Sequence, residues 1–189
     1  MIFRIQLATL LSSVILIADS EGPNNPSADS GGWSSSTSNA YTQSDTYANT
    51  GVDGDIQTYT GFGFSIPSGA TIDGVTVEYD AFKTGTRNNT FRFNLVNVGT
   101  CTSKETGVLA TSDTDTYGTE GGTSDTWSCT SLTVTNVNSS SFGISVELDR
   151  AGGPAPASLS WTPDHFRVTV EYTPAATGRS RMMFVGGDD

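Results

Sequence analysis

The residue types that enzymes use for catalysis are scarce in this sequence. Its 189 residues contain one histidine, His165, and two cysteines, Cys101 and Cys129. No phosphate-binding loop, dinucleotide-binding glycine pattern, zinc-ligand spacing or nucleophile elbow is present. His165 lies beside Asp164 at the start of an expected strand, where we expect its imidazole to hydrogen-bond to Asp164 or to the backbone. We therefore predict that the protein is not an enzyme and uses no cofactor.

The two cysteines lie near the ends of expected strands. A disulfide between Cys101 and Cys129 would fit a protein that works in an oxidising environment. Two reduced thiols would fit equally well in a particle that is assembled inside a cell. The sequence leaves both states open.

Closely spaced aspartates suggest a cation site. Asp53 and Asp55 have the i, i+2 spacing of a calcium-binding loop, and Asp113 and Asp115 repeat it. Calcium takes about six to eight oxygen ligands, and no complete loop consensus accompanies either pair. We therefore predict solvated acidic loops and no bound metal, with Asp53 and Asp55 as the alternative calcium ligands.

Aromatic side chains could bind a sugar, because many β-sandwich lectins stack glycans on aromatic faces flanked by Asp and Asn. The candidates are the three tryptophans, Trp33, Trp127 and Trp161, together with Tyr41, Tyr47 and Tyr117. The alternative is packing in the core, where large aromatic residues contribute most of the buried area of a small β protein. We favour core packing.

The charge balance excludes two classes of partner. Nine Lys and Arg residues stand against twenty Asp and Glu residues, which gives a formal net charge of −11. No basic face is available to cover nucleic-acid phosphates, and anionic membrane surfaces are equally unfavourable. We predict no nucleic acid and no membrane partner.

Short segments of alternating polarity occupy residues 33–174, separated by clusters of Gly, Pro, Asn, Asp and Ser. In the segment FRVTVEY, residues 166–172, apolar side chains take every second position, as in a half-buried strand. The other expected strands cover residues 59–66, 72–84, 90–98, 132–137 and 142–148. This pattern predicts an all-β fold, a single jelly-roll-like β-sandwich.

The first twenty residues differ from the rest. Arg4 precedes an apolar run over residues 5–18, which several polar residues interrupt and which is too short and too polar to span a membrane. The segment resembles a secretory signal peptide, with Ala18-Asp19-Ser20 as a cleavage site. The alternative, which we favour, is a retained arm that buries its apolar residues on a neighbouring subunit. These residues are Ile2, Phe3, Ile5, Leu7, Leu10, Leu11, Val14 and Ile15.

Two further segments flank the expected sandwich. Residues 21–32 contain two Pro, three Gly and two Asn, and we expect a linker without a regular element. Residues 175–189 form a tail with an apolar tetrad, Met182, Met183, Phe184 and Val185. This tetrad either docks on a neighbouring subunit or forms a last strand on its own sheet.

Four segments resemble, in order, a recurrent β-sandwich module of tailed-phage virion proteins and bacterial surface proteins. They are Trp33-Ser34 followed by SNAYTQSDTYANT, then GFGFSIPSGATIDGVTVEYDA, then GGTSDTW with LTVTNVNSSSFGISV, and finally PDHFRVTVEY. The resemblance covers roughly residues 28–173 and leaves the arm and the tail outside. It implies the sandwich fold but carries no activity, because fold does not fix function.

These observations favour a structural protein of a tailed-phage virion. We expect a decoration or cement protein on the capsid surface, oligomeric, with the major capsid protein or other virion proteins as partners. The alternative is a tail, baseplate or fibre component, or a secreted surface lectin, that binds host glycan.

Overall fold

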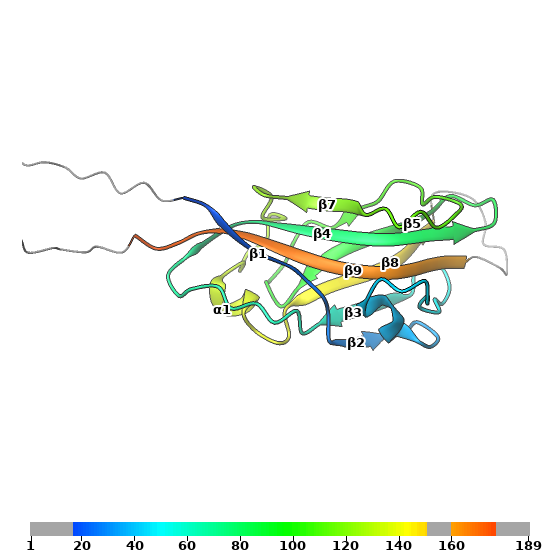
Figure 1. Cartoon of the computed structure of the whole chain (residues 1–189), viewed down its shortest axis with the longest axis horizontal. Coiled ribbons are helices and arrows are strands. Elements are labelled where there is room, and N and C mark those ends of the chain that lie inside the picture. The colour runs from blue at the N-terminus through cyan, green and yellow to red at the C-terminus, as the bar shows by residue number, and fades with distance from the viewer. Residues whose placement is uncertain (1–16, 151–159, 177–189) are drawn as a thin grey trace, which may run out of the picture.

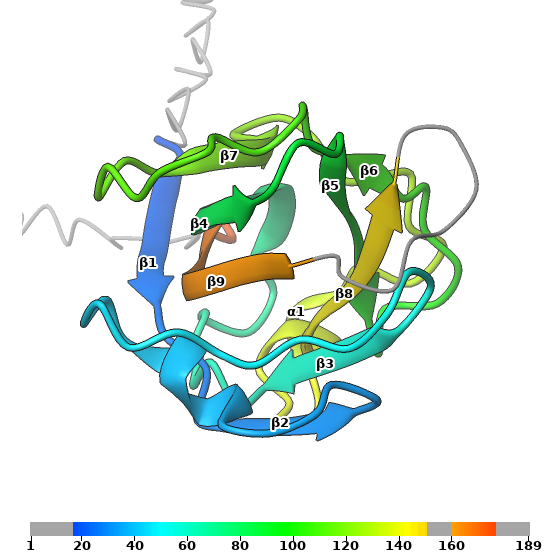
Figure 2. The same cartoon turned by 90° about the vertical axis from the view of Figure 1, so that its right-hand side faces the viewer.

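Two antiparallel β-sheets pack face to face in the computed structural model, which describes residues 17–150 and 160–176 (Figures 1 and 2). The first sheet has the order β1 (Asp19–Asn24), β9 (Ser160–Thr173), β4 (Thr71–Thr84) and β7 (Gly118–Gly122). The second has the order β2 (Ala28–Gly31), β3 (Ile56–Thr60), β8 (Gly143–Arg150), β5 (Asn89–Val96) and β6 (Lys104–Glu105). A 3₁₀ helix, η1 (Thr37–Tyr41), and a short helix, α1 (Val134–Val137), lie in the connections. The predicted all-β sandwich is confirmed.

The connections have jelly-roll topology. With β2 as an additional edge strand, β1-β9-β4-β7 faces β3-β8-β5-β6. From β3 onward, every connection crosses from one sheet to the other except the one between β5 and β6. This is the eight-strand, double-sheet arrangement of two Greek keys that defines a jelly roll.

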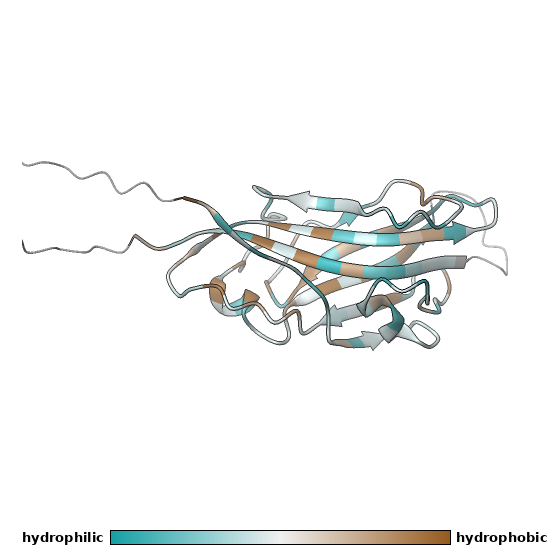
Figure 3. Ribbon diagram, in the orientation of Figure 1, coloured by the Kyte–Doolittle hydropathy of each residue, from teal (hydrophilic) through white to brown (hydrophobic). Residues whose placement is uncertain are grey.

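The β4–β9 pair is the longest ladder and defines two ends of the sandwich. Thr71 pairs with Thr173 at the end we call proximal, and Thr84 pairs with Ser160 at the end we call distal. A register shift between Asp80 and Ala81 adds one residue, Asp164, to β9. Figure 3 shows apolar and polar positions alternating along both strands, which is the pattern of a sheet with one face in the core.

The core between the sheets is built around aromatic rings. Phe91, Phe93 and Phe166 are fully buried and contact one another with ring centroids 5.8–5.9 Å apart. Tyr59 joins them at 5.1 Å from Phe166, and Trp33 covers this group from the side of Tyr59. The tilted and edge-on arrangements are those that aromatic pairs prefer. The alternation predicted for residues 166–172 is confirmed by the buried side chains at every second position.

Three local expectations are wrong. Residues 61–66 leave the sheet after β3, although Phe62, Phe64 and Ile66 remain buried against the core. Residues 132–137 contain α1 in place of a strand, because the Thr133 side chain accepts a hydrogen bond from the Asn136 backbone and caps a helical turn. Residues 21–32 are no linker, since they contain most of β1 and all of β2.

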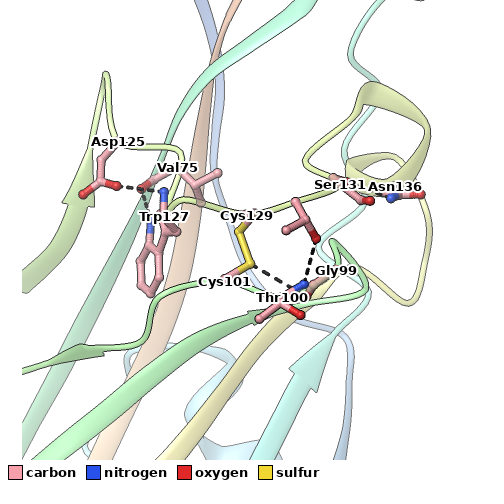
Figure 4. The surroundings of a disulfide bond; sticks show 10 residues. Val75, Gly99, Thr100, Cys101, Asp125, Trp127, Cys129, Ser131 and Asn136 are labelled. Carbon is pink, nitrogen blue, oxygen red and sulfur yellow. Dashed lines mark hydrogen bonds between the residues drawn. A yellow bond between two sulfur atoms is a disulfide. The ribbon is translucent and has the colours of Figure 1, made fainter.

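A disulfide between Cys101 and Cys129 ties the two sheets together at the proximal end (Figure 4). Cys101 follows β5 of the second sheet, and Cys129 follows β7 of the first. Backbone hydrogen bonds run beside it from Thr102 N to Trp127 O, 2.8 Å, and from Thr130 N to Thr100 O, 3.0 Å. The choice that the sequence left open is resolved in the structure in favour of the disulfide.

Replacing both cysteines, as in Cys101→Ser with Cys129→Ser, should lower the free energy of unfolding by about 2–4 kcal/mol, because the open chain gains entropy when unfolded. Urea denaturation monitored by tryptophan fluorescence measures the loss. The wild-type protein under reducing conditions should show a similar loss, whereas the double variant should not respond to the reductant. Equal stability of the oxidised protein and the double variant would contradict this assignment.

Candidate functional site

The predicted arm and tail lie outside the described residues, but their points of attachment do not. Residues 2–15 and 182–185 hold all the apolar side chains assigned to partner binding. Asp19 pairs with Tyr172, and the Tyr172 hydroxyl donates a hydrogen bond to Asp19 Oδ2 at 3.1 Å. The start of β1 and the end of β9 therefore lie side by side at the proximal end (Figure 1).

The three tryptophans do not form a sugar-stacking platform. Trp33, Trp127 and Trp161 expose only 6%, 1% and 1% of their surface. Trp127 Nε1 donates to the Val75 carbonyl at 2.9 Å, and Trp161 Nε1 donates to the Thr90 carbonyl at 2.8 Å. All three rings belong to the buried core, so the core packing that the sequence analysis favoured is confirmed, and the less favoured glycan platform on these three residues is wrong.

Asp53 and Asp55 do not converge on a common ion position. Asp55 Oδ2 accepts a hydrogen bond from Val52 N at 2.9 Å, which closes its own loop. Asp53 lies 3.8 Å from Arg150 Nη2. Each carboxylate thus has a separate structural partner, which argues against the calcium alternative at this loop.

A different group of acidic residues comes together nearer the distal end. Asp45, Asp113 and Asp115 each place one carboxylate oxygen within 4.8 Å of the others. Asp113 is already engaged, because Tyr47 Oη donates to its Oδ2 at 2.7 Å and the Asp115 backbone N donates to its Oδ1 at 3.1 Å. Exposed carboxylates of this kind are well solvated, and we assign no ion to them.

Two further carboxylates beneath this group are buried. Asp80 is 2% exposed and accepts a hydrogen bond from Gln43 Nε2 at 2.9 Å. Asp164 is fully buried and accepts from Ser44 N, with both oxygens at 3.3 Å. Burial, together with the nearby charges of Asp113 and Asp164, raises the pKa of Asp80 to about 6. Burial also raises the pKa of Asp164.

His165, on β9, is part of a polar network that connects the loops around Asn25 and Tyr117 to the sheet. Its Nδ1 lies 2.6 Å from Tyr117 Oη and its Nε2 lies 3.0 Å from Asn25 Oδ1. A hydrogen bond with the Tyr41 backbone also acts on the ring, so the backbone alternative that the sequence offered for His165 is confirmed. Burial, together with the charge of Arg167, lowers the pKa of His165 to about 4, so the ring is neutral near pH 7.

The contacts of His165 indicate that this residue helps to hold the loop that contains Tyr117 in place. Tyr117 Oη also donates to Gln43 Oε1 at 3.1 Å, and the Tyr117 ring lies 3.8 Å from the Arg167 guanidinium. Arg167 in turn makes a two-point ion pair with Glu78, at 3.0 and 2.9 Å. The loop that contains Tyr117 is thereby held against β9 by stacking and hydrogen bonds.

A polar hollow of about 380 Å³, which we call the distal hollow, lies where the segment after η1 meets the start of β9. Its lining residues are Ser34, Tyr47, Ala48, Asn49, Thr50, Trp161 and Thr162. Sequence analysis named Tyr47 and Trp161 among several aromatic candidates and missed the other lining residues. These residues come from three separate segments, and no local motif joins them.

A scan against protein-family models finds no match, and searches of curated proteins and of solved structures find no significant similarity. Among the described residues, no helix has the length and apolar character needed to cross a membrane.

Replacing the buried carboxylate, as in Asp80→Asn, should stabilise the protein above pH 7 and have little effect near pH 4. The folded-state pKa of about 6 lies above the ordinary 3.8, so the folded protein holds a proton that the unfolded chain has lost. The stability that the protonated form contributes is complete below pH 4 and is lost as the pH rises through 6. Thermal unfolding from pH 4 to pH 8 should show a difference that grows to the order of 1 kcal/mol.

His165 titrates in an overlapping range with the opposite sign, but it is present in both proteins and cancels in their difference. A variant that is less stable than the wild type at pH 8, or whose difference does not change with pH, would contradict the burial of an unpaired charge at Asp80.

Proposed function

We propose that the chain is a structural protein of a tailed-phage virion, acting as a decoration or cement protein on the capsid surface. Its role is mechanical: the sandwich is a rigid body, and the terminal segments attach it to neighbouring subunits. The partners are the major capsid protein or other virion proteins, including further copies of this chain. The resemblance of residues 28–173 to a virion β-sandwich module motivates the assignment.

The edges of the sandwich are poorly suited to assembly by strand addition. The edge strand β1 contains Pro23 and two acidic residues, and β2 and β6 are only four and two residues long. The fourth edge, β7, has the sequence GTEGG. Prolines, charges, glycines and short lengths are features that prevent edge-to-edge pairing. Contacts with neighbours must therefore use another part of the molecule.

Exposed apolar surface is also sparse on the described part of the chain. The large apolar residues that are exposed there are Ile17, Val52, Ile56 and Val108. Ile17 is the most exposed of them, at 77%, and it lies where the apolar N-terminal segment meets β1. The apolar residues that could bury area on a partner are concentrated in residues 2–15 and 182–185.

The observation that carries the proposal is the pairing of the described residues that lead into these two segments. The pairing of Asp19 with Tyr172 brings their attachment points together at the proximal end. Two apolar segments from one end can bind adjacent sites on a shell, and linked binding raises the effective concentration of the second contact. Burial of several hundred Å² at about 25 cal/mol per Å² would then add several kcal/mol per subunit.

Two measurements test this role. In purified particles, the copy number relative to the most abundant shell protein should reach hundreds, as expected for capsid decoration; a few dozen copies would place the protein on the tail or a vertex. A variant that begins at Ile17 should lose most of its particle occupancy, because it lacks the apolar arm. Its thermal unfolding should match that of the full chain, since β1 and its contacts remain.

The full-length variant Leu10→Asp with Leu11→Asp provides a matched control for chain length. It should lose occupancy like the truncated protein. Full occupancy by both variants would refute the arm as an anchor, and absence of the protein from particles would refute the virion assignment.

A further inference from the structure

The distal hollow has walls held in place by the protein's own hydrogen bonds. Ala48 N donates to the Pro163 carbonyl at 2.9 Å, and Asn49 N donates to the Ser35 carbonyl at 3.0 Å. These bonds fix the segment after η1 against β9 on one side and against the chain preceding η1 on the other. A preformed wall reduces the entropy that a ligand must lose on binding.

Three of the hydroxyl groups around the hollow already donate their protons to acceptors inside the protein. Ser34 Oγ donates to the Thr50 carbonyl at 3.0 Å, and Thr50 Oγ1 donates to the Trp161 carbonyl at 3.0 Å. Tyr47 Oη donates to Asp113 at 2.7 Å. Each oxygen keeps lone pairs that can accept a hydrogen bond. The hollow therefore favours a ligand that brings several donors.

Two other lining groups add to this polar character. Asn49 Nδ2 donates to Ser35 Oγ at 2.9 Å, which leaves the amide oxygen as a further acceptor. Thr162 Oγ1 is buried in the wall and has no hydrogen-bond partner among the described residues. Thr162 thus retains both its donor and its acceptor capacity.

Tyr47 supplies an aromatic ring of fixed orientation. Its hydroxyl is held by Asp113, and its ring packs edge-on against Phe82 with centroids 5.1 Å apart. The hydrogen bond to Asp113, burial and the charge of Asp113 together raise the pKa of Tyr47 to about 12, so the phenol stays neutral. A rigid ring that borders a set of acceptors provides both an apolar surface and polar contacts at low entropic cost.

The charges in and around the hollow determine whether a donor-rich ligand should be neutral, cationic or anionic. The side chains that line the hollow are all uncharged, so an ammonium group within it would lose hydration without gaining an ion pair. Asp113 beside Tyr47 and the net charge of −11 disfavour anionic ligands. A volume of about 380 Å³ falls in the range of roughly 300–1,000 Å³ that small-molecule sites occupy.

We propose that the distal hollow is a binding site for a neutral saccharide, with one sugar ring against Tyr47 and its hydroxyls donating to Ser34, Asn49 and Thr50. The site lies at the end of the β4–β9 ladder opposite the terminal segments. It does not rest on the proposed virion role, because particle occupancy and sugar binding can fail separately.

Saturation-transfer NMR on the full chain tests the site. The neutral probes are the methyl glycosides of glucose, galactose, mannose and fucose, together with N-acetylglucosamine; glucosamine and sialyllactose are the charged probes. At least one neutral sugar should receive saturation at its ring protons, and the charged probes should receive less. Ser34→Ala and Tyr47→Ala should each weaken binding by about tenfold, since each removes a direct contact.

Tyr117→Phe is the matched control, because it alters a tyrosine on a neighbouring loop that does not line the hollow. It should bind sugar like the wild type. Ser34→Ala removes one hydroxyl from an exposed residue, so it reports on binding even if Tyr47→Ala fails to fold. Saturation of no neutral sugar, saturation of the charged probes alone, or binding unchanged in Ser34→Ala would overturn the proposal.

Discussion

The long antiparallel ladder between β4 and β9 is the constraint on which the rest of the structure depends. Because side chains alternate across a sheet, this register directs Val77 and Phe166 into the core and Glu78 and Arg167 to the opposite face. The same ladder sets the direction of the molecule, since it brings both terminal segments to the proximal end and the distal hollow to the other. A slip of one residue would exchange the two faces and destroy both arrangements.

The face of the β4–β9 ladder that points away from the core carries buried acidic residues whose hydrogen-bond partners are not cations. His165 and Asp80 are paired across the strands on this face, and two loops cover them. Gln43 and Tyr117 bridge the pair with neutral hydrogen bonds. The raised pKa of Asp80 and the lowered pKa of His165 both follow from burial, and both favour the uncharged forms. The loops are thus held in part by hydrogen bonds from the neutral side chains of Gln43 and Tyr117, and Asp80 becomes charged as the pH rises through about 6.

The sequence predicts those parts of the fold whose pattern is local. Alternation of period two identifies most of β4, β5 and β8 and the second half of β9, because each has one face in the core. The same criterion fails for residues 61–66, where Phe62 and Phe64 are buried by packing outside the sheet. It also fails for β1 and β2, whose residues are mostly exposed and whose strand conformation comes from pairing with β9 and β3. Edge strands of this kind have no hydrophobic pattern to detect.

The candidate site was less predictable than the fold for a related reason. Tryptophan suggests sugar binding by its residue type, but in a small sandwich the large rings are needed to fill the core, as Trp127 and Trp161 do. The hollow instead uses a tyrosine whose hydroxyl is held by Asp113, 66 residues away. Such a site depends on the relative placement of loops, which the strand pairing determines and the local sequence does not.

The proximal and distal ends of the sandwich differ in the kind of contact that they can make. Proline, glycine, charged residues and short length protect the edge strands against pairing with a strand of another molecule. Apolar residues are concentrated in segments that join at the proximal end, and preorganised polar groups border the hollow toward the distal end. Apolar contacts are suited to a permanent interface, while a wall of fixed acceptors is suited to a small hydrated ligand. A protein anchored by its proximal end would present the distal hollow to the surroundings, so the two proposed roles are compatible in a single chain.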